Sequence, residues 1–471
     1  MLWREWYRVV SLLGKSCARR RTFLWLVSCL AMMSLPHDEL GVAGLLRAGG
    51  LTERCYRGFL RLFHSSAVRL DTLTLLWVAT TLQLFRPFRI AGHPVVVVDA
   101  TKRPKEGRKM PGVKLLHQDS DCNTKRPFIM GHCFQTLALL VRTGTPRAWA
   151  VPLVARLSDG VRASPSEKRG LIDKAASLVL ETIGLVFLGP VIVVADSFYA
   201  SRSLLLPLLA AGHHVVSRLR ANGVAYWPAA GFERRRGRKR KWGKKVKLSS
   251  LFAKDDAFQE VTIEREEARF TVRYRCLDLL WRPTRGLVRF VLVKYPDWPN
   301  AILMSSDTTM PPAAIIQCYA YRFRIELTFR AAIHAVHAFA YRFWLMGMKP
   351  WHFGGGAQYL HRETAEHRQA VYRKIQAYDL WAQLAAIAQG LLMHLAINLR
   401  NEVWGGYHRF MRTRRTDLPP SEMVTAAVLA ATFDEFRTIV GRDEKKRQFF
   451  AAALGQWGAA GAGPPAATMP A

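Results

Sequence analysis

Hydrophobic residues follow different spacings in three successive parts of the chain. Through about residue 87 the spacing is helical, and residues 40–47 and 52–64, on either side of Gly49 and Gly50, predict two helices joined by a short turn. From residue 88 the apolar runs become short and rich in β-branched residues, which is typical of strands. Beyond about residue 312 helical spacing returns. This order predicts an α/β core with helical regions before and after it.

Two of the short apolar runs predict strands buried at the centre of a sheet. Residues 95–98 are four valines followed by Asp99, and residues 191–195 are followed by Asp196. A run that is apolar on both faces is typical of a strand covered by helices on both sides. Further strands are expected at 112–117, 128–141 and 214–219, with helices at 166–183 and 201–211. We therefore predict a mixed sheet with helices on both faces.

A β-rich insertion interrupts this alternation. Strands are expected at residues 270–280, 287–294 and 301–305, and one continuous helix from Pro312 past Arg330. The regions we predict are a helical N-terminal region at 1–87, the first part of the core at 88–219, the insertion at 220–310, the last core helix at 311–348, a helical C-terminal region at 349–457, and a disordered tail at 458–471.

Charge is the unusual property of the composition. The 471 residues include 69 Lys and Arg against 35 Asp and Glu, a net charge of +34, while the hydrophobic fraction of 50% excludes wholesale disorder. Such an excess favours a polyanionic partner, nucleic acid before a membrane surface. Ten of the fourteen residues 234–247 are basic, which favours phosphate contact over a merely solvated loop. The residues that we assign to DNA there are Arg234, Arg235, Arg236, Arg238, Lys239, Arg240, Lys241, Lys244 and Lys245.

Neither a zinc module nor a membrane span is predicted. The seven cysteines include no C-x-x-C pair, which favours a reducing cytoplasm. The apolar run at residues 23–35 follows three arginines as in a signal peptide, but about 13 residues are too few to cross a bilayer, and we expect a buried helix. Arg54, Arg57 and Arg61 share one side of the second predicted helix, which is either a DNA-binding surface or a solvated basic face.

Three carboxylates are candidates for chemistry. Asp99 and Asp196 each end a buried strand, where side chains face the ligand crevice, and a carboxylate there must be solvated, paired or bound to metal. Glu326 shares one helical face with Tyr319, Arg322 and Arg330, at steps of three, four and four residues. That polar stripe is either a set of surface ion pairs or part of a site.

The chain resembles the DDE transposases of bacterial insertion sequences, in the group with a Tyr-x-x-Arg-x-x-x-Glu signature. Three blocks carry the resemblance, which extends over about residues 90–345: residues 95–101, residues 191–199 and residues 319–330. It implies a ribonuclease-H-like core in which Asp99, Asp196 and Glu326 bind two Mg²⁺ ions, with Mn²⁺ able to substitute. Carboxylate oxygens suit these hard cations, and two ions can stabilise both the attacking and the leaving oxygen of a phosphodiester.

The resemblance also implies partners and a location. It predicts double-stranded DNA as terminal inverted repeats and as target, a homodimer in the DNA complex, and the bacterial cytoplasm at the nucleoid, with no membrane. It assigns Arg322 the position that neutralises phosphate, and we assign Tyr319 and Arg330 of the same stripe to DNA or phosphate binding as well. The alternatives are a catalytically decayed copy that binds DNA, or another ribonuclease-H-like nuclease.

Some residues depart from the family pattern or have two interpretations. Ile333 stands where the family has a lysine, which favours the decayed copy. We expect His334 and His337 to be ordinary helix residues rather than metal ligands. Trp242 and Trp298 either stack on a flipped base or, as we favour, pack within the insertion.

Overall fold

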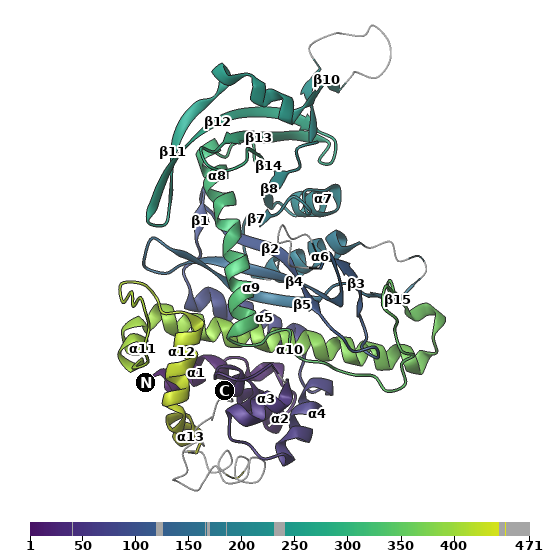
Figure 1. Cartoon of the computed structure of the whole chain (residues 1–471), viewed down its shortest axis with the longest axis vertical. Helices are drawn as coiled ribbons and strands as arrows, with labels where there is room; N and C mark the ends of the chain where they lie inside the picture. The colour runs from purple at the N-terminus through teal and green to yellow at the C-terminus, as the bar shows by residue number, and fades with distance from the viewer. Residues whose placement is uncertain are drawn as a thin grey trace.

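The structure is a computed structural model, and it describes residues 1–39, 41–118, 126–164, 166, 170–184, 186–229, 241–441 and 448. Figure 1 shows the sheet in the middle, the β-rich insertion above it, and the helices of both chain ends below. One sheet of thirteen strands passes through the core and the insertion. The insertion is therefore an extension of the core sheet rather than a separate one.

Five strands form the core part of the sheet, in the order β5–β4–β2–β7–β8. Strands β2, β4 and β5 are antiparallel neighbours, whereas β7 and β8 run parallel to β2. The sheet is therefore mixed, and the predicted α/β fold class is confirmed. The strands are β2 (His93–Pro104), β4 (Phe128–Arg142), β5 (Ala148–Leu157), β7 (Ile192–Ala195) and β8 (His214–Leu219), with the short β1 (Arg89–Ile90) and β3 (Lys114–His117) paired to β2 and β4.

The insertion continues the sheet beyond β8 through antiparallel pairs, in the order β14, β13, β12, β9 and β10. Strand β11 forms a long hairpin with β12. The predicted β-rich insertion before the last core helix is thus confirmed. Its strands are β9 (Val224–Pro228), β10 (Trp242–Lys247), β11 (Gln259–Arg265), β12 (Ala268–Trp281), β13 (Gly286–Lys294) and β14 (Ala301–Ser305).

Alternate residues of β2 belong to two hydrophobic clusters on opposite faces of the sheet, as strand geometry requires. Val96 and Val98 pack in the cluster that contains the N-terminal helices, α6 (Leu171–Ile183), α7 (Arg202–Ala210) and α10 (Ala365–Asn398). Val95 and Val97 pack in the other cluster, with α8 (Pro312–Ala320) and the first half of α9 (Arg324–His334). Helices therefore cover both faces, as predicted.

Helix α10 is the central helix of the lower half of the molecule. Nearly every residue from Ala377 to Ala396 is buried, so this part of the helix is covered on all sides. By length and composition α10 could cross a membrane, but 94% of its apolar window is buried inside the protein, as in the core helix of a packed domain. Trp77 packs against Gly390 so closely that an added Cβ would lie 2.2 Å from its ring.

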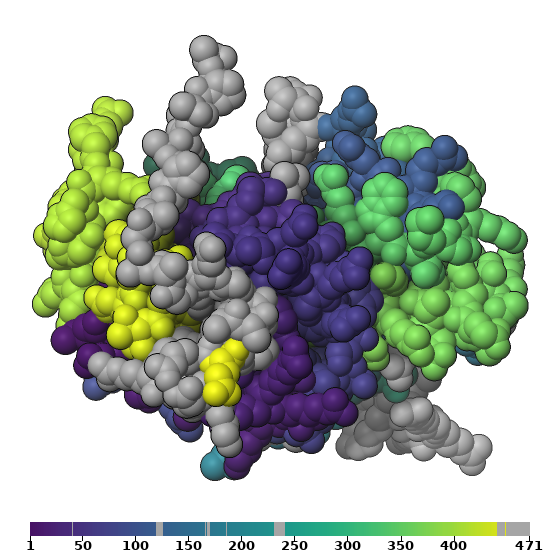
Figure 2. Space-filling view, turned by 90° about the horizontal axis from the view of Figure 1, so that it is seen from below, coloured from purple at the N-terminus to yellow at the C-terminus, as the bar shows by residue number. Residues whose placement is uncertain are grey.

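The helices of the two chain ends pack together beneath α10. Figure 2 shows them side by side, the N-terminal ones in purple and the C-terminal ones in yellow. The Met1 amine pairs with Glu435 at 3.0 Å, and the Trp3 indole donates to the Leu429 carbonyl at 3.0 Å. The helices of the two chain ends are α1 (Leu2–Ser11), α2 (Arg20–Met33), α3 (Val42–Ala48), α4 (Arg54–His64), α5 (Leu70–Leu84), α11 (Arg400–Gly406), α12 (Glu422–Ala431) and α13 (Phe433–Gly441), of which α5 lies between α10 and the sheet (Figure 1).

Two predictions made for these helices can be compared with the structure. The apolar part of α2 is buried from Leu26 to Met33, as a core helix would be. Arg54, Arg57 and Arg61 are all exposed on α4. Both interpretations of this basic face, DNA-binding surface and solvated face, are compatible with that exposure.

The structure differs from the predicted elements mainly at one strand and two helices. Strand β5 was not predicted. Helix α6 begins at Leu171 rather than at residue 166. At its observed start, the Gly170 amide donates to the Asp173 carboxylate at 2.8 Å. The expected continuous helix from Pro312 is two helices, because a 3₁₀ turn, η4 (Tyr321–Phe323), separates α8 from α9.

Candidate active site

Asp99 lies inside β2 rather than at its end. The strand continues to Pro104, and Asp99 is opposite Thr136 of β4. Because side chains alternate along a strand, Asp99 is on the same face as Val95 and Val97, where α8 and α9 pack. Asp99 therefore lies on the face of the central strand that α8 and α9 cover.

Asp196 follows the last residue of the neighbouring parallel strand, β7. Val95 and Val97 of β2 are level with Ile192 and Val194 of β7, and the same register continued by two residues sets Asp99 level with Asp196. Neighbouring strands are about 4.8 Å apart. The sheet itself therefore brings the two aspartates side by side.

The third carboxylate comes from the helices that cover this face. Tyr319 is in α8, Arg322 is in the 3₁₀ turn η4, and Glu326 and Arg330 are in α9. Arg322 donates from Nη1 to Asp99 Oδ2 at 3.0 Å, and from Nη2 to Glu326. One guanidinium thus joins a carboxylate of the central strand to a carboxylate of the covering helix.

The carboxylates share one electrostatic environment. Burial raises the pKa of Asp99 to about 6, Arg322 opposes that shift, and the charges of Asp196 and Glu326 add to it. The Asp99 side chain is only 16% exposed, against 43% for Glu326. Three carboxylates face one guanidinium, so negative charge is in excess and a further cation would be stabilised there.

Two side chains beside the aspartates were not singled out from the sequence. The buried Ser217 of β8 donates to the Asp196 carbonyl at 2.8 Å. Tyr199 is buried, and its pKa is raised by burial first and then by the charges that include Asp99 and Asp196. The Asp196-Ser-Phe-Tyr199 run already contained Tyr199, whereas no local signal pointed to Ser217 on the next strand.

The donor atoms fit divalent cations, although the side chains are not arranged around one. Among the described residues, no three His, Cys, Asp or Glu side chains are grouped closely enough to hold a metal ion. Arg322 instead contacts both Asp99 and Glu326, so that a guanidinium supplies the positive charge between them. Carboxylate oxygens are the ligands that Mg²⁺ and Mn²⁺ prefer, and Asp99, Asp196 and Glu326 offer only these.

The described part of the basic tract lies far from the carboxylates along the sheet. Lys244 and Lys245 are exposed on β10, which is the outermost strand of the insertion in the sheet, and Lys241 is exposed just before it. Figure 1 shows β10 at the top of the molecule, away from α9. The remaining predicted DNA contacts, Arg234, Arg235, Arg236, Arg238, Lys239 and Arg240, lie outside the described residues.

The residues at and just beyond the end of α9 differ in their exposure and contacts. Arg330 and His334 are exposed, whereas Ile333 packs against the main hydrophobic core. His337 lies beyond the helix, where its Nε2 is 2.6 Å from the His37 carbonyl oxygen. A lysine at position 333 would therefore replace an apolar contact with the core.

The two candidate tryptophans both lie in the insertion. Trp242 is half-buried, and its ring centroid is 5.3 Å from that of Tyr226. Trp298 is 56% exposed, with its ring centroid 5.8 Å from that of Tyr295. Trp242 has the packing expected for an insertion residue, while Trp298 has most of its ring open to solvent.

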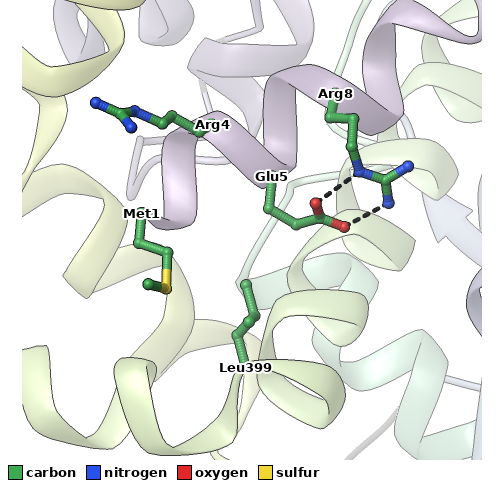
Figure 3. Close-up of a pocket in the computed structure, with 5 residues that line it drawn as sticks. All are labelled: Met1, Arg4, Glu5, Arg8 and Leu399. Atoms are coloured by element: carbon green, nitrogen blue, oxygen red, sulfur yellow. Dashed lines mark hydrogen bonds and ion pairs between the residues drawn. The ribbon is translucent and has the colours of Figure 1, made fainter.

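A hollow of about 480 Å³ lies elsewhere, at helix α1. Figure 3 shows its lining, with Glu5 bonded to Arg8. Glu5 also lies 2.8 Å from Nε2 of His394 in α10. The hollow adjoins the packed helices of the chain ends and includes none of the three carboxylates. Its lining residues are Met1, Arg4, Glu5, Arg8 and Leu399.

Comparison with known proteins gives a family. The model described as "DDE superfamily endonuclease" matches residues 11–277, more than half of the chain. The chain belongs to this family. The match includes Asp99 and Asp196, and it ends before Glu326, so the third carboxylate of this DDE-family chain rests on the contacts described above.

The other comparisons add little. Among solved structures, the chain is similar to a piggyBac transposase in a synaptic complex with hairpin DNA, at 10% identity and a TM-score of 0.35, over 93% of this chain and 76% of that one. A likeness that low supports no argument about this protein. No curated protein matches the chain.

Proposed function

We propose that this DDE-family protein is the transposase of an insertion sequence, which binds terminal inverted repeats, cleaves DNA at their ends and joins the ends to target DNA. One observation carries the proposal. Asp99 and Asp196 are level on adjacent parallel strands, and Arg322 connects Asp99 to Glu326 on the covering helix. A family of endonucleases and a shared carboxylate environment together favour metal-dependent phosphodiester chemistry.

The proposed site uses Asp99, Asp196 and Glu326 as ligands for two divalent ions, Mg²⁺ or Mn²⁺. When bound, such ions activate the attacking oxygen and stabilise the leaving one. Asp99 must be ionised to take part. Arg322 has to leave at least one of its carboxylate partners, and its guanidinium is then free to bind a phosphate oxygen.

DNA is the partner that the charge distribution favours. The net charge is +34, and Lys241, Lys244 and Lys245 are exposed on the edge of the insertion. Each phosphate contact would make binding weaken with added salt. We further propose that the protein acts as a homodimer, because two DNA ends must be held together, and that it acts at the nucleoid of a bacterial cytoplasm.

The test is cleavage of double-stranded DNA that carries the flanks of the protein's own gene, in Mg²⁺ or Mn²⁺. Wild type should cut at the ends of inverted repeats, while Asp99→Asn, Asp196→Asn and Glu326→Gln should bind the same DNA and not cut it. Asp256→Asn, which changes an exposed aspartate of the insertion, is the matched control and should cut normally. Cleavage by any of the three carboxylate variants would contradict the role of that residue.

A second candidate function is DNA binding without catalysis, by a decayed copy. It is favoured by Ile333, which stands in place of the family lysine and packs against the core. Wild type that binds the flanks and cuts in neither Mg²⁺ nor Mn²⁺ would support it. Cleavage with no preference for repeat ends would instead indicate another nuclease of the same fold.

A further inference from the structure

The last core helix is divided at the candidate active site. Helix α8 ends at Ala320, α9 begins at Arg324, and Arg322 lies in the 3₁₀ turn between them. A short 3₁₀ stretch within a helix often marks a hinge. The position of Glu326, in the first turn of α9, therefore depends on what holds the start of α9.

The two helices pack against different parts of the sheet. Ile315 and Ile316 of α8 are in the same hydrophobic cluster as Val291 and Val293 of the insertion strand β13. Thr328 of α9 instead donates to the Ala150 carbonyl of β5, in the core, at 2.6 Å. Movement of the insertion relative to the core would thus act at the turn that carries Arg322.

The β11–β12 hairpin contacts both sides of that turn. Gln317 of α8 donates to the Glu264 carbonyl of β11 at 3.0 Å. Glu266 follows Glu264 by two residues in the hairpin, and its carboxylate pairs with Arg324, the first residue of α9. Figure 1 shows the hairpin beside α8 and extending down past its end. The hairpin is therefore connected to the end of one helix and the start of the next.

The tip of the hairpin is a two-residue turn, Glu266-Glu267, closed by the pairing of Arg265 with Ala268. Glu266 has φ 59°, a conformation that favours glycine and costs a side chain about 1 kcal/mol or more. Its ion pair offsets that cost. Glu267 lies 3.4 Å from Arg147 of the β4–β5 turn and 3.5 Å from Arg415, so the tip also contacts the core beside α9.

Arg324 needs the carboxylate that it contacts. Its side chain is only 12% exposed, and burial lowers its pKa to about 10, as do the nearby charges of Arg147 and Arg265. A cation in the first turn of a helix also opposes the helix dipole. Without Glu266, repulsion and desolvation would favour movement of Arg324 toward solvent, and the first turn of α9 would move with it.

We propose that Glu266 is a positioning residue for the active site: through Arg324 it holds the first turn of α9, so that Glu326 stays beside Asp99 and Arg322. The effect on catalysis rests on the proposed function, whereas the effect on α9 does not. The insertion then has a role besides DNA contact, because its hairpin sets the geometry of the third carboxylate.

The test compares Glu266→Gln with Glu264→Gln in the full-length protein. Glu264 is the matched control, because its carboxylate pairs with Arg269 on the same hairpin, at 2.7 Å, and both side chains are well exposed. Single-turnover cleavage of bound DNA should be about tenfold to a hundredfold slower in Glu266→Gln, the size expected when a reacting group is displaced by about 1 Å. The dissociation constant for DNA should stay within about twofold of wild type, and Glu264→Gln should behave as wild type.

Two further measurements separate positioning from general damage. Amide exchange in residues 321–334 should be faster in Glu266→Gln than in Glu264→Gln, and exchange in α10 should not change. The charge exchange Glu266→Arg with Arg324→Glu should recover at least part of the lost rate. Wild-type cleavage and unchanged exchange in Glu266→Gln would overturn the proposal. If wild type cuts no DNA, the proposed function fails, and amide exchange alone decides whether Glu266 holds α9.

Discussion

Asp99 and Asp196 follow similar apolar runs in the sequence, yet the structure gives them different surroundings. Asp99 lies within a long strand, 16% exposed, with its carboxylate bonded to Arg322 and its pKa raised by burial. Asp196 follows a strand of four residues, where its Oδ1 accepts a hydrogen bond from the Phe198 amide at 3.0 Å. Similar sequence contexts therefore hide one buried, ion-paired carboxylate and one at a turn.

The difference indicates separate contributions to a single site. Asp196 is held by the backbone of its own turn, so its orientation is local. Asp99 also has a local bond, since its Oδ1 accepts from the Ala100 amide at 2.8 Å, but its Oδ2 is bonded to Arg322, which also contacts Glu326. The surroundings of Asp99 therefore depend on the position of Arg322 and α9, in addition to its own strand.

The largest predicted effect is the same for both residues. Asp99→Asn and Asp196→Asn should each lower the rate of DNA cleavage by about 10³-fold or more, since each removes a proposed metal ligand. The rate on pre-bound DNA measures this, with DNA affinity as the control. A loss in only one of the two variants would mean that the level positions on β2 and β7 do not reflect a shared role.

The pH dependence of stability should report the buried surroundings of Asp99. The folded-state pKa of Asp99, about 6, lies above its unfolded value near 3.8, so folding favours the protonated form. Its contribution to the free energy of unfolding, about 3 kcal/mol, is therefore present below about pH 4 and lost as pH rises through 6. Urea unfolding between pH 4 and 7 should show a shallower decline for Asp99→Asn than for wild type.

Asp379 provides the control for that measurement. Burial raises its pKa to about 6 as well, and it accepts a hydrogen bond from the Leu157 amide at 2.7 Å. Asp379→Asn should remove a separate share of the same decline. If Asp99→Asn leaves the pH dependence unchanged, the buried environment described for Asp99 is wrong.

Arg322→Gln should move the pH dependence of stability that arises from Asp99. Arg322 lowers the pKa of Asp99, so without it that pKa should rise further. The stability decline assigned to Asp99 should then shift to higher pH in the Arg322→Gln protein. A shift to lower pH, or none, would contradict the pairing of Arg322 with Asp99.

The smallest predicted effect tests the Asp196 side. Ser217→Ala removes one hydrogen bond to the Asp196 carbonyl, at a cost of about 1 kcal/mol in unfolding free energy. The rate of cleavage should change only slightly, because the Asp196 carboxylate keeps its hydrogen bond from the Phe198 amide. A large loss of cleavage would show that this turn depends on β8.

The sheet was predictable because its central strands carry strong local patterns. Four valines before Asp99 and the run before Asp196 predicted β2 and β7, and both are buried. Strand β5 was missed because Pro152 argues against a strand. The structure accommodates Pro152 at an edge strand, at a register shift where it pairs with Ala138, and its carbonyl accepts from the Trp77 indole.

The candidate site was predictable only in part. The stripe of Tyr319, Arg322, Glu326 and Arg330 predicted an ion pair between Arg322 and Glu326, and the structure contains it. The 3₁₀ turn and the contact of Arg322 with Asp99 were not predictable, because both depend on packing between segments more than 200 residues apart. The pairing of Glu266 with Arg324 was not predictable either, because it depends on how the insertion hairpin packs against α9.

Single-turnover cleavage of pre-bound flanking DNA in Mg²⁺, compared among wild type, Asp99→Asn and Asp379→Asn, tests the central claim most directly. The two variants remove buried aspartates whose pKa values are raised alike, but only Asp99 is linked to Glu326 through Arg322. The proposed site predicts cleavage by wild type and Asp379→Asn, and none by Asp99→Asn. Cleavage by Asp99→Asn at the wild-type rate would contradict it.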